Sequence, residues 1–430
     1  YLIAQGLTAD FDSGKEQPHL LKMALDRLKQ LSAHEIGHTL GLPHNYIASV
    51  AARASVMDYP HPTIKITDGR IDLSDAYAMG IGEFDKMAIR WGYQEFPAGA
   101  DEKAELNKIT EEVIGKGYLF LSDQDARPDG SVHPQTHLWD NGTNATEDLK
   151  HIMQVRRLAL QNFGTARIPV GTPYANLEEV LVPVYMLHRF QTQAAAKAIG
   201  GAYYSFGLEG DKLPVYAPAP AKEQQEALEA LLATLDPDFL ALSPELIRLI
   251  PPRAYRFGAN QREIFRRHTG MTFDPLGPAE ASAQLTLSLL LNADRASRLA
   301  SQKLLQADLP SLADVLNKTS RTLWKAPGLA AADYKGQIRR VTAVMYLSEL
   351  MKLSRTPSAS VEAKIAALDA IREIKGLVQA ATGFNRLVQD LIRRFEENPK
   401  DFEPETFFVA PDGQPIDQDY DWLGMDCTGE

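Results

Sequence analysis

The sequence predicts a mainly α-helical protein, with a small metal-binding unit first and a large helical region with little β structure after it. Two observations predict this fold class. Apolar residues recur at three- and four-residue intervals through most of the chain after residue 96, which is the period of an α-helix. Three histidines and a glutamate also cluster in one short segment near the beginning, at spacings that suit a single metal ion.

The chain of 430 residues is long enough for about two or three domains. We expect a zinc-binding unit over residues 1–95, a helical region over 96–215 and a C-terminal helical domain over 216–430. Pro97 and Gly99 mark the first boundary, and the linker-like stretch 207–220 marks the second.

The net charge of -11 argues against nucleic acid as a partner, because nucleic-acid binding requires a basic surface. No apolar segment is long enough to predict a transmembrane span. The single cysteine, Cys427, excludes an internal disulfide and lies in an acidic tail that we expect to be loose.

The first elements are predicted from short patterns. Residues 1–6 suit a short strand, and Pro18 suits the first turn of a helix whose apolar stripe is Leu21, Leu25 and Leu28. Residues 74–91 read as a helix that closes the metal-binding unit, and residues 202–206 as a short strand. Further helices are predicted over residues 147–163, 174–199, 223–235, 280–305, 311–324, 332–354, 361–381 and 384–397.

The second predicted element carries the chemistry, in the segment from His34 to His44. His34 and His38, four residues apart on a helix, differ by about 40° in direction and about 6 Å along the axis, so both face one metal ion. Glu35 lies beside the first ligand, where it can hold a water without binding the metal.

The third histidine needs a break in the helix. On a continued helix, His44 would point roughly 240° away from His38 and lie about 9 Å further along. Gly41 can adopt the left-handed conformation that ends helices, so the chain can turn and bring His44 back to the metal. Pro43 then prevents the helix from resuming.

A methionine follows the third histidine at a short interval, in the segment 54–60. Met57 is expected to form a packed floor under the ligands, a role that this residue has in metzincin peptidases. Tyr59 has two readings, which the sequence leaves even: a tyrosine that approaches the metal, or an amphipathic core residue with its hydroxyl at the surface.

Together, the segments 33–49, 55–59 and 81–93 resemble a family of large bacterial zinc-dependent metalloproteases of metzincin type. The matching motifs cover about the first quarter of the chain. The resemblance implies one Zn2+ per chain at His34, His38 and His44, with Glu35 as the catalytic base. It also implies a polypeptide substrate and export to the periplasm, the outer membrane or the extracellular space.

Metzincins place a twisted sheet before the zinc helix, and the residues before His34 are too few to build one. We therefore expect this chain to be the C-terminal part of a longer precursor, with the missing N-terminal half as its partner. We also expect the zinc helix to pack mainly against residues 74–91 and the helical region.

The chemistry of the motif predicts peptide-bond hydrolysis by a zinc-activated water, with Glu35 accepting the proton of that water and passing it to the departing amine. Two other hypotheses are open. In one, the chain holds zinc but is inactive, and its helical region serves as a docking module for a substrate or partner protein. The third reading is a purely structural metal site, which Glu35 argues against because such a site needs no base.

The remaining candidates are weaker. Residues 123–130 carry carboxylates at alternating positions, as a calcium-binding loop does. Pro134 stands where such a loop needs a glutamate, so we expect a polar surface loop. His61 follows Met57 closely and could line a cleft. The other histidines lack ligand spacing and are expected to be ordinary surface or core residues: His19, His133, His137, His151, His188 and His268.

Overall fold

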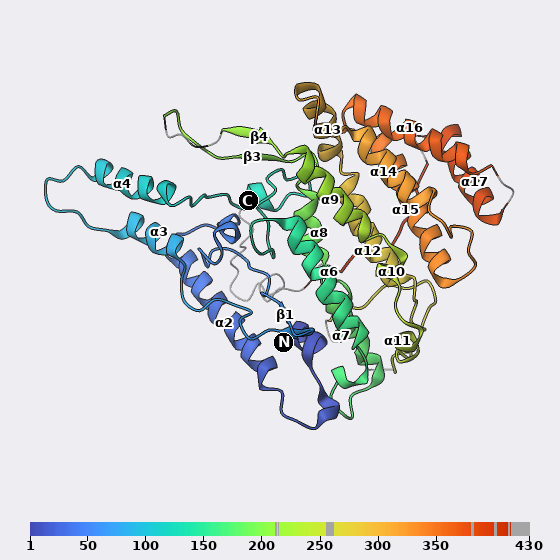
Figure 1. Ribbon diagram of the computed structural model, residues 1–430, viewed down its shortest axis with the longest axis horizontal. Helices are drawn as coiled ribbons and strands as arrows, with labels where there is room; N and C mark the ends of the chain where they lie inside the picture. Colours follow the sequence, from blue (N-terminus) through green and yellow to red (C-terminus); the bar gives the residue numbers. More distant parts are fainter. Residues whose placement is uncertain are drawn as a thin grey trace.

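The structure, a computed structural model, describes residues 1–210, 213, 215–254, 262–379, 382–399, 402–411 and 413. Cys427 and the acidic tail lie outside the described residues. The described part of the chain is mainly helical and contains two small antiparallel sheets of two strands each, so the predicted fold class is confirmed (Figure 1). None of the helices in this part is long and apolar enough to cross a membrane.

The first element is a helix, α1 (Leu2–Thr8), so the predicted strand over residues 1–6 is wrong. Ala4 and Leu7 are buried in a core shared with α2 (Pro18–Thr39) and α6 (Ala145–Gln161). Gly6 lies directly against α7 (Leu177–Tyr185), where a Cβ atom would come within 2.4 Å of Val184. Packing against α7 therefore decides the conformation, which no local pattern encodes.

Helix α2 begins at Pro18 as predicted, but its apolar stripe is not its buried face. Leu21, Leu25 and Leu28 are 57%, 45% and 45% exposed. The buried face instead runs through positions that recur every three or four residues: Leu20, Met23, Arg27, Gln30, His34 and Gly37. The face that carries the histidines is thus turned inward although it is less apolar than its neighbour.

Helix α3 (Glu83–Tyr93) starts later than the predicted residue 74. Gly82 caps it and lies so close to Ala54 that a Cβ atom would meet the Ala54 carbonyl oxygen at 1.8 Å. The hairpin of β1 (Lys65–Thr67) and β2 (Arg70–Asp72) precedes it, and α4 (Glu102–Gly115), which the sequence did not predict, packs beside it. The α3–α4 pair projects from the body of the molecule (Figure 1).

Two predicted long helices are each broken in two. The segment 174–199 forms α7 and α8 (Arg189–Ala196), and Pro183 lies inside the last turn of α7. The segment 280–305 forms α12 (Gly277–Leu290) and α13 (Ala293–Leu305). There the Asn292 side chain accepts hydrogen bonds from the backbone N–H groups of residues 294 and 295, which starts a new helix.

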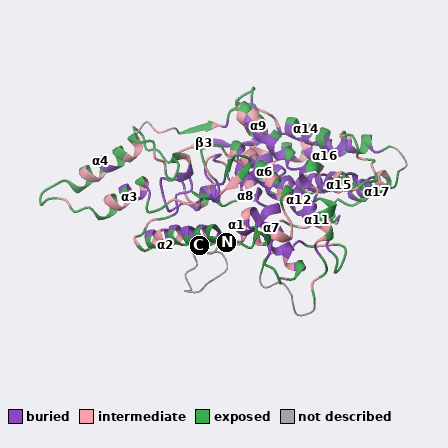
Figure 2. Ribbon diagram, turned by 60° about the horizontal axis from the view of Figure 1, so that its bottom comes forward, coloured by how far each residue is buried: buried purple, intermediate pink, exposed green. Residues whose placement is uncertain are grey.

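The C-terminal part packs as a helical array around the largest core (Figures 1 and 2). Figure 2 shows α12 and α15 mostly buried and α4 mostly exposed. The remaining helices and strands are α5 (Asp123–Ala126), β3 (Ala202–Tyr204), β4 (Tyr216–Pro218), α9 (Ala221–Ala233), α10 (Pro237–Leu240), α11 (Pro244–Arg248), α14 (Leu312–Trp324), α15 (Tyr334–Arg355), α16 (Val361–Leu377) and α17 (Gly383–Glu397).

A pair of neighbouring leucines tests which face of α2 carries the stability of the fold. Leu20 is fully buried, so Leu20→Ala is expected to lower the free energy of unfolding by about 2–5 kcal/mol. Leu21 is 57% exposed, so Leu21→Ala should change it by no more than about 0.5 kcal/mol. Urea unfolding of the two variants measures both values. A larger loss for Leu21→Ala than for Leu20→Ala would contradict the observed orientation.

Candidate metal centre

The end of α2 delivers two of the three histidines and the turn that leads to the third. His34 and His38 lie one turn apart, and the helix ends at Thr39. Gly41 has a φ of +82°, the left-handed conformation predicted for it. The Leu42 N–H donates to the Gly37 carbonyl at 3.0 Å, which closes the helix end and reverses the chain.

His44 is held in place by a second segment of the chain. The Asn45 N–H donates to the carbonyl of Met57 at 2.9 Å, and the Tyr46 N–H donates to the carbonyl of Leu121 at 2.9 Å. The segment after His44 is therefore tied to two segments that come later in the sequence. Together these contacts fix the direction in which the His44 ring points.

Each of the three rings has its Nδ1 atom bound to an acceptor. His34 Nδ1 lies 2.6 Å from the carbonyl of Val56, and His38 Nδ1 lies 2.9 Å from the carbonyl of Leu42. His44 Nδ1 lies 2.8 Å from Asp123 Oδ2. Because carbonyl and carboxylate oxygens only accept, each Nδ1 carries the proton and each Nε2 presents a lone pair.

The three Nε2 lone pairs converge, and this decides what the site can hold. One ligand nitrogen from each histidine lies within 4.8 Å of the others, and His34 Nε2 is 2.9 Å from His38 Nε2. Tetrahedral zinc ligands, at about 2.0–2.1 Å from the metal, are about 3.3 Å apart. Converging lone pairs repel one another unless a cation lies between them, so this donor set fits a zinc ion.

Electrostatics keep the first ring in the state that binds metal. His34 is fully buried, and burial lowers its pKa to about 3 despite the opposing hydrogen bond from Nδ1 to Val56. The nearby charges of His38, His44 and Arg27 lower this pKa further. His34 is therefore neutral at any pH at which the protein is expected to work.

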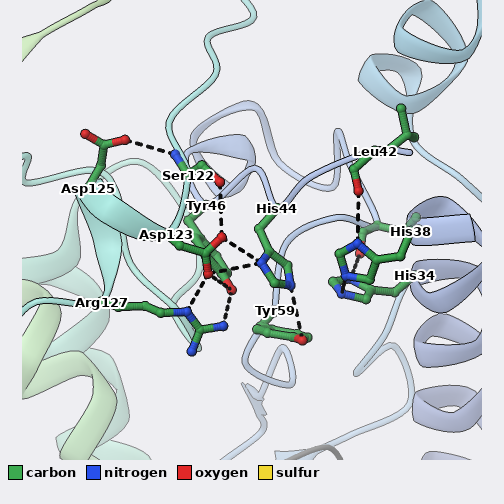
Figure 3. A network of polar contacts seen from close by, with 11 residues as sticks. His34, His38, Leu42, His44, Tyr46, Tyr59, Ser122, Asp123, Asp125 and Arg127 are labelled. Carbon is green, nitrogen blue, oxygen red and sulfur yellow. Dashed lines mark hydrogen bonds and ion pairs between the residues drawn. The ribbon is translucent and has the colours of Figure 1, made fainter. Parts of the chain in front are cut away.

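The residue that orients His44 comes from a segment with no local link to the motif. Asp123 begins the short helix α5 and accepts from His44, while Tyr46 and Arg127 also donate to it (Figure 3). Partial burial acts to raise the pKa of Asp123, but the hydrogen bonds from His44 and Arg127 outweigh it and hold that pKa below its usual range. Asp123 is thus a carboxylate beside a candidate ligand histidine.

This contact corrects the prediction of a polar surface loop over residues 123–130. Asp125 and Ala126 are buried, and Asp123 is only partly exposed. The alternating carboxylates serve separate purposes: Asp123 accepts from His44, and Asp125 accepts from the Ser122 N–H at 3.0 Å to start α5. No signal near residue 123 identifies His44 as its partner, because 79 residues separate the two.

Met57 and Tyr59 contact different parts of the site, Met57 the backbone of α2 and Tyr59 the histidine rings. Met57 is 1% exposed and lies against α2 at Gly37, where a Cβ atom would come within 2.2 Å of the Met57 sulfur. The Tyr59 ring is stacked on His34 at 4.6 Å, and its hydroxyl lies 3.3 Å from His44 Nε2 (Figure 3). Tyr59 is therefore both a buried packing residue and a hydroxyl at the ligand cluster.

Glu35 follows His34 on α2 and is exposed. Helix α2 was expected to pack mainly against residues 74–91 and the helical region, and part of this packing is observed, because Leu20 and Met23 share a core with Ala76 and with α6. Near the histidines, the inward side of α2 meets the loop around Val56 and Met57, through His34 and Gly37. A link to α3 does exist at the end of the helix, where the Tyr93 hydroxyl donates to the Leu40 carbonyl at 2.9 Å.

Two buried carboxylates, Asp58 and Asp140, lie behind the site. They flank the hydrogen bond from the Trp139 N–H to the Tyr59 carbonyl, which is 2.7 Å long. Burial raises the pKa of both groups, and the charge of Asp58 raises that of Asp140 further. The sequence did not predict that these two aspartates are buried, since an isolated aspartate carries no signal of its burial.

The other histidines are placed as follows. His61 is buried and lines a cavity rather than joining the ligand cluster, with its Nδ1 3.1 Å from the carbonyl of Pro62. Among the residues that the structure describes, His34, His38 and His44 form the only group of three potential metal-binding side chains. The remaining histidines do not join such a group, as expected from their spacing.

Comparison with known proteins gave one match. A family model described as Met-zincin matches residues 16–328, which is more than two thirds of the chain. The match extends far beyond the first quarter that the motifs cover and includes Asp123, Trp139 and the helices from α2 to α14. No curated protein and no solved structure matched the chain.

The contact between Asp123 and His44 predicts a measurable effect on metal affinity. Asp123→Asn keeps the size of the side chain but removes its charge, so zinc affinity should fall about 10- to 100-fold. Competition with a fluorescent zinc chelator measures this. Asp129→Asn, an exposed position after the same helix, is the matched control and should leave the affinity unchanged. Equal affinities for wild type and Asp123→Asn would show that His44 is oriented by its other contacts.

The raised pKa of Asp58 predicts how stability depends on pH. In the unfolded chain an aspartate ionises near pH 4, whereas in the folded protein Asp58 keeps its proton to higher pH. The folded state thus binds more protons, and this group makes stability fall as pH rises above about 4. Asp58→Asn should flatten that fall, which urea unfolding at several pH values measures. Identical slopes for the two proteins would contradict the assignment.

Proposed function

The chain belongs to the Met-zincin family, and from this premise we propose that it is a zinc-dependent metallopeptidase that hydrolyses peptide bonds in a polypeptide substrate. One observation carries the proposal beyond family membership. The Nε2 atoms of His34, His38 and His44 converge and are unprotonated, because each Nδ1 is bound to an oxygen acceptor. Three histidine ligands leave a fourth position for water or substrate, as in catalytic zinc sites.

The proposed roles follow from the positions of the side chains. Bound to these nitrogens, zinc supplies a Lewis acid that polarises the scissile carbonyl and makes water more acidic. Glu35, the exposed neighbour of His34 on α2, accepts the proton of the attacking water on its carboxylate. The same carboxylic acid then donates that proton to the departing amine, so Glu35 returns to its starting state.

Tyr59 is proposed to assist at the ligand cluster. Its hydroxyl lies 3.3 Å from His44 Nε2, so it is close enough to donate a hydrogen bond to an oxygen of the substrate beside the ligands. The stacking on His34 and Trp139, at 4.6 and 5.0 Å, fixes the plane of the ring. The hydroxyl of Tyr59 faces the three histidines and not the surface, which supports the first of the two sequence readings.

The role of Met57 is proposed to be mechanical. It fills the space beside Gly37 under the first two ligands, and its flexible thioether fits the narrow gap that the missing Cβ leaves. The proposed cofactor is one Zn2+ per chain. Export, and the three domains with boundaries after residues 95 and 215, rest on the family resemblance and the sequence pattern.

Substitution of the proposed base separates catalysis from metal binding. Glu35→Gln should retain zinc and lose about 100-fold or more of the rate, because an amide can hold water but cannot take its proton. The measurements are zinc content by elemental analysis and cleavage of a denatured, fluorescently labelled casein. Glu16→Gln, an exposed position just before α2, is the control and should retain full activity.

The same experiment distinguishes the alternative function. Zinc-loaded wild-type protein that cleaves no faster than Glu35→Gln would support an inactive zinc-bearing or docking module. Full activity in Glu35→Gln would require another base. Loss of zinc from His44→Ala, with zinc retained in His61→Ala, is expected if the ligands are the three histidines of the cluster.

A further inference from the structure

A cavity of about 440 Å³ lies between α1, α2 and the segments around His61 and Phe190. Two stacked rings lie between it and His34: Trp139 lines the cavity and stacks on Tyr59, which in turn stacks on His34. Most of its wall is apolar, and its size is typical of small-ligand pockets. Its lining includes Met23, Arg27, His61, Trp139, Pro183 and Phe190.

The wall of the cavity has one arginine more than it has carboxylates to pair with. Two of the arginines are near carboxylates that also line the cavity: Arg189 lies 3.4 Å from Glu263, and Arg262 lies 3.9 Å from Glu179. Arg27 has no carboxylate within 4.0 Å among the described residues. The wall therefore has one buried cation without a counter-ion in the described part of the chain.

Part of the Arg27 guanidinium has no protein partner among the described residues. Arg27 is 7% exposed, and its Nη1 donates to Gln30. Its guanidinium carbon lies 5.4 Å from the centre of the Trp139 ring. The Nη2 atom is buried and has no hydrogen-bond partner among the described residues. A buried guanidinium that lacks a partner is costly, and a carboxylate that accepts two parallel hydrogen bonds satisfies it best.

The position of Arg27 relates the cavity to the site of the reaction. Arg27 and His34 are seven residues apart on α2, so they share one face of the helix and are separated by about 10 Å along its axis. An extended peptide advances about 3.3 Å per residue, so this separation corresponds to about three residues. A polypeptide whose scissile bond lies at the three histidines can thus place a nearby side chain in the cavity.

We propose that this cavity is a specificity pocket for an acidic side chain of the polypeptide substrate, with Arg27 as the counter-ion of its carboxylate. The proposal rests on the proposed peptidase function and adds to it a preference among substrates. The apolar wall packs against the methylene groups of the side chain, and Arg27 binds the carboxylate at its end. A glutamine at the same position has the same shape but no charge to neutralise Arg27.

The first test measures binding without turnover, so that it does not depend on peptidase activity. Zinc-loaded Glu35→Gln protein is titrated with alanine-rich peptides in a calorimeter. Each peptide has a single Glu or Gln, placed at one position within about three residues on either side of the peptide bond that would be cleaved. At one position the Glu peptide is expected to bind about 10-fold or more tightly than the Gln peptide. Equal binding of Glu and Gln at every position would overturn the proposal.

Two substitutions on α2 assign the preference to the cavity. Arg27→Gln should bring the two affinities within about twofold of each other, while zinc content stays the same. Lys29→Gln, which removes the same charge from an exposed position two residues on, should keep the full preference. Arg27→Lys retains the charge without the planar fork and is expected to keep a reduced preference of the same direction. An undiminished preference in Arg27→Gln would overturn the proposal.

A second probe separates failure of this proposal from failure of the proposed function. Phenylacetate and phenylacetamide have the same shape and differ in charge, and the acid is expected to bind more tightly in an Arg27-dependent manner. An acid preference in both the small probes and the peptides supports the pocket, even if the wild-type protein cleaves no polypeptide. If phenylacetate binds more tightly than phenylacetamide but the Glu and Gln peptides bind equally, the assignment of the cavity to a substrate side chain is overturned.

Discussion

The arrangement of this part of the molecule depends on one constraint, which is that three imidazole rings must point their Nε2 lone pairs at a single position. An imidazole ring without partners can rotate about its side-chain bonds. Here a hydrogen bond from Nδ1 fixes the orientation of each ring, and the acceptors are the carbonyls of Val56 and Leu42 and the carboxylate of Asp123. Each acceptor comes from a different segment. The loop around Met57, the turn at Gly41 and the helix α5 must therefore all be in place before the donor set is complete.

The same constraint explains the unusual burial on α2. A helix normally buries its most apolar face, yet here the leucine stripe of residues 21, 25 and 28 is exposed and the face with His34 and Arg27 is buried. Burial of the polar face is supported by hydrogen bonds from His34 to Val56 and from Gln30 to Arg27 and Val56, whereas Arg27 Nη2 has no partner among the described residues. Burial in turn lowers the pKa of His34 and keeps it ready to bind a cation.

Local chemistry in the sequence was sufficient to predict the motif and its turn. The spacing of His34, His38 and His44, with Gly41 between them, depends only on helix geometry and on the conformational freedom of glycine, and the cluster and the positive φ followed. The partner of His44 could not be predicted, because Asp123 is 79 residues away and its own neighbourhood resembles a loop. Roles for Glu35, Met57 and Tyr59 stay predictions.

For the fold, the helix periodicity predicted where most helices lie but not where they break. The interruptions near residues 187 and 292 arise from packing and from a capping asparagine inside continuous apolar patterns. The strand predicted over residues 1–6 failed for a related reason, since a short apolar segment takes the conformation that its neighbour imposes, and that neighbour is α7. These errors concern elements whose conformation depends on distant contacts, whereas α4 was missed although Asp101 caps it locally.

The link between His44 and Asp123 also has a consequence for synthesis of the chain. During translation, the segment with all three histidines leaves the ribosome well before residue 123, and domains fold as their residues emerge. A nascent chain that ends before Asp123 has its ligands but lacks the carboxylate that fixes the third ring. Tight metal capture is therefore delayed until the later segment has folded onto the earlier one. A truncated product of interrupted translation is expected to bind a metal ion more weakly than the folded chain.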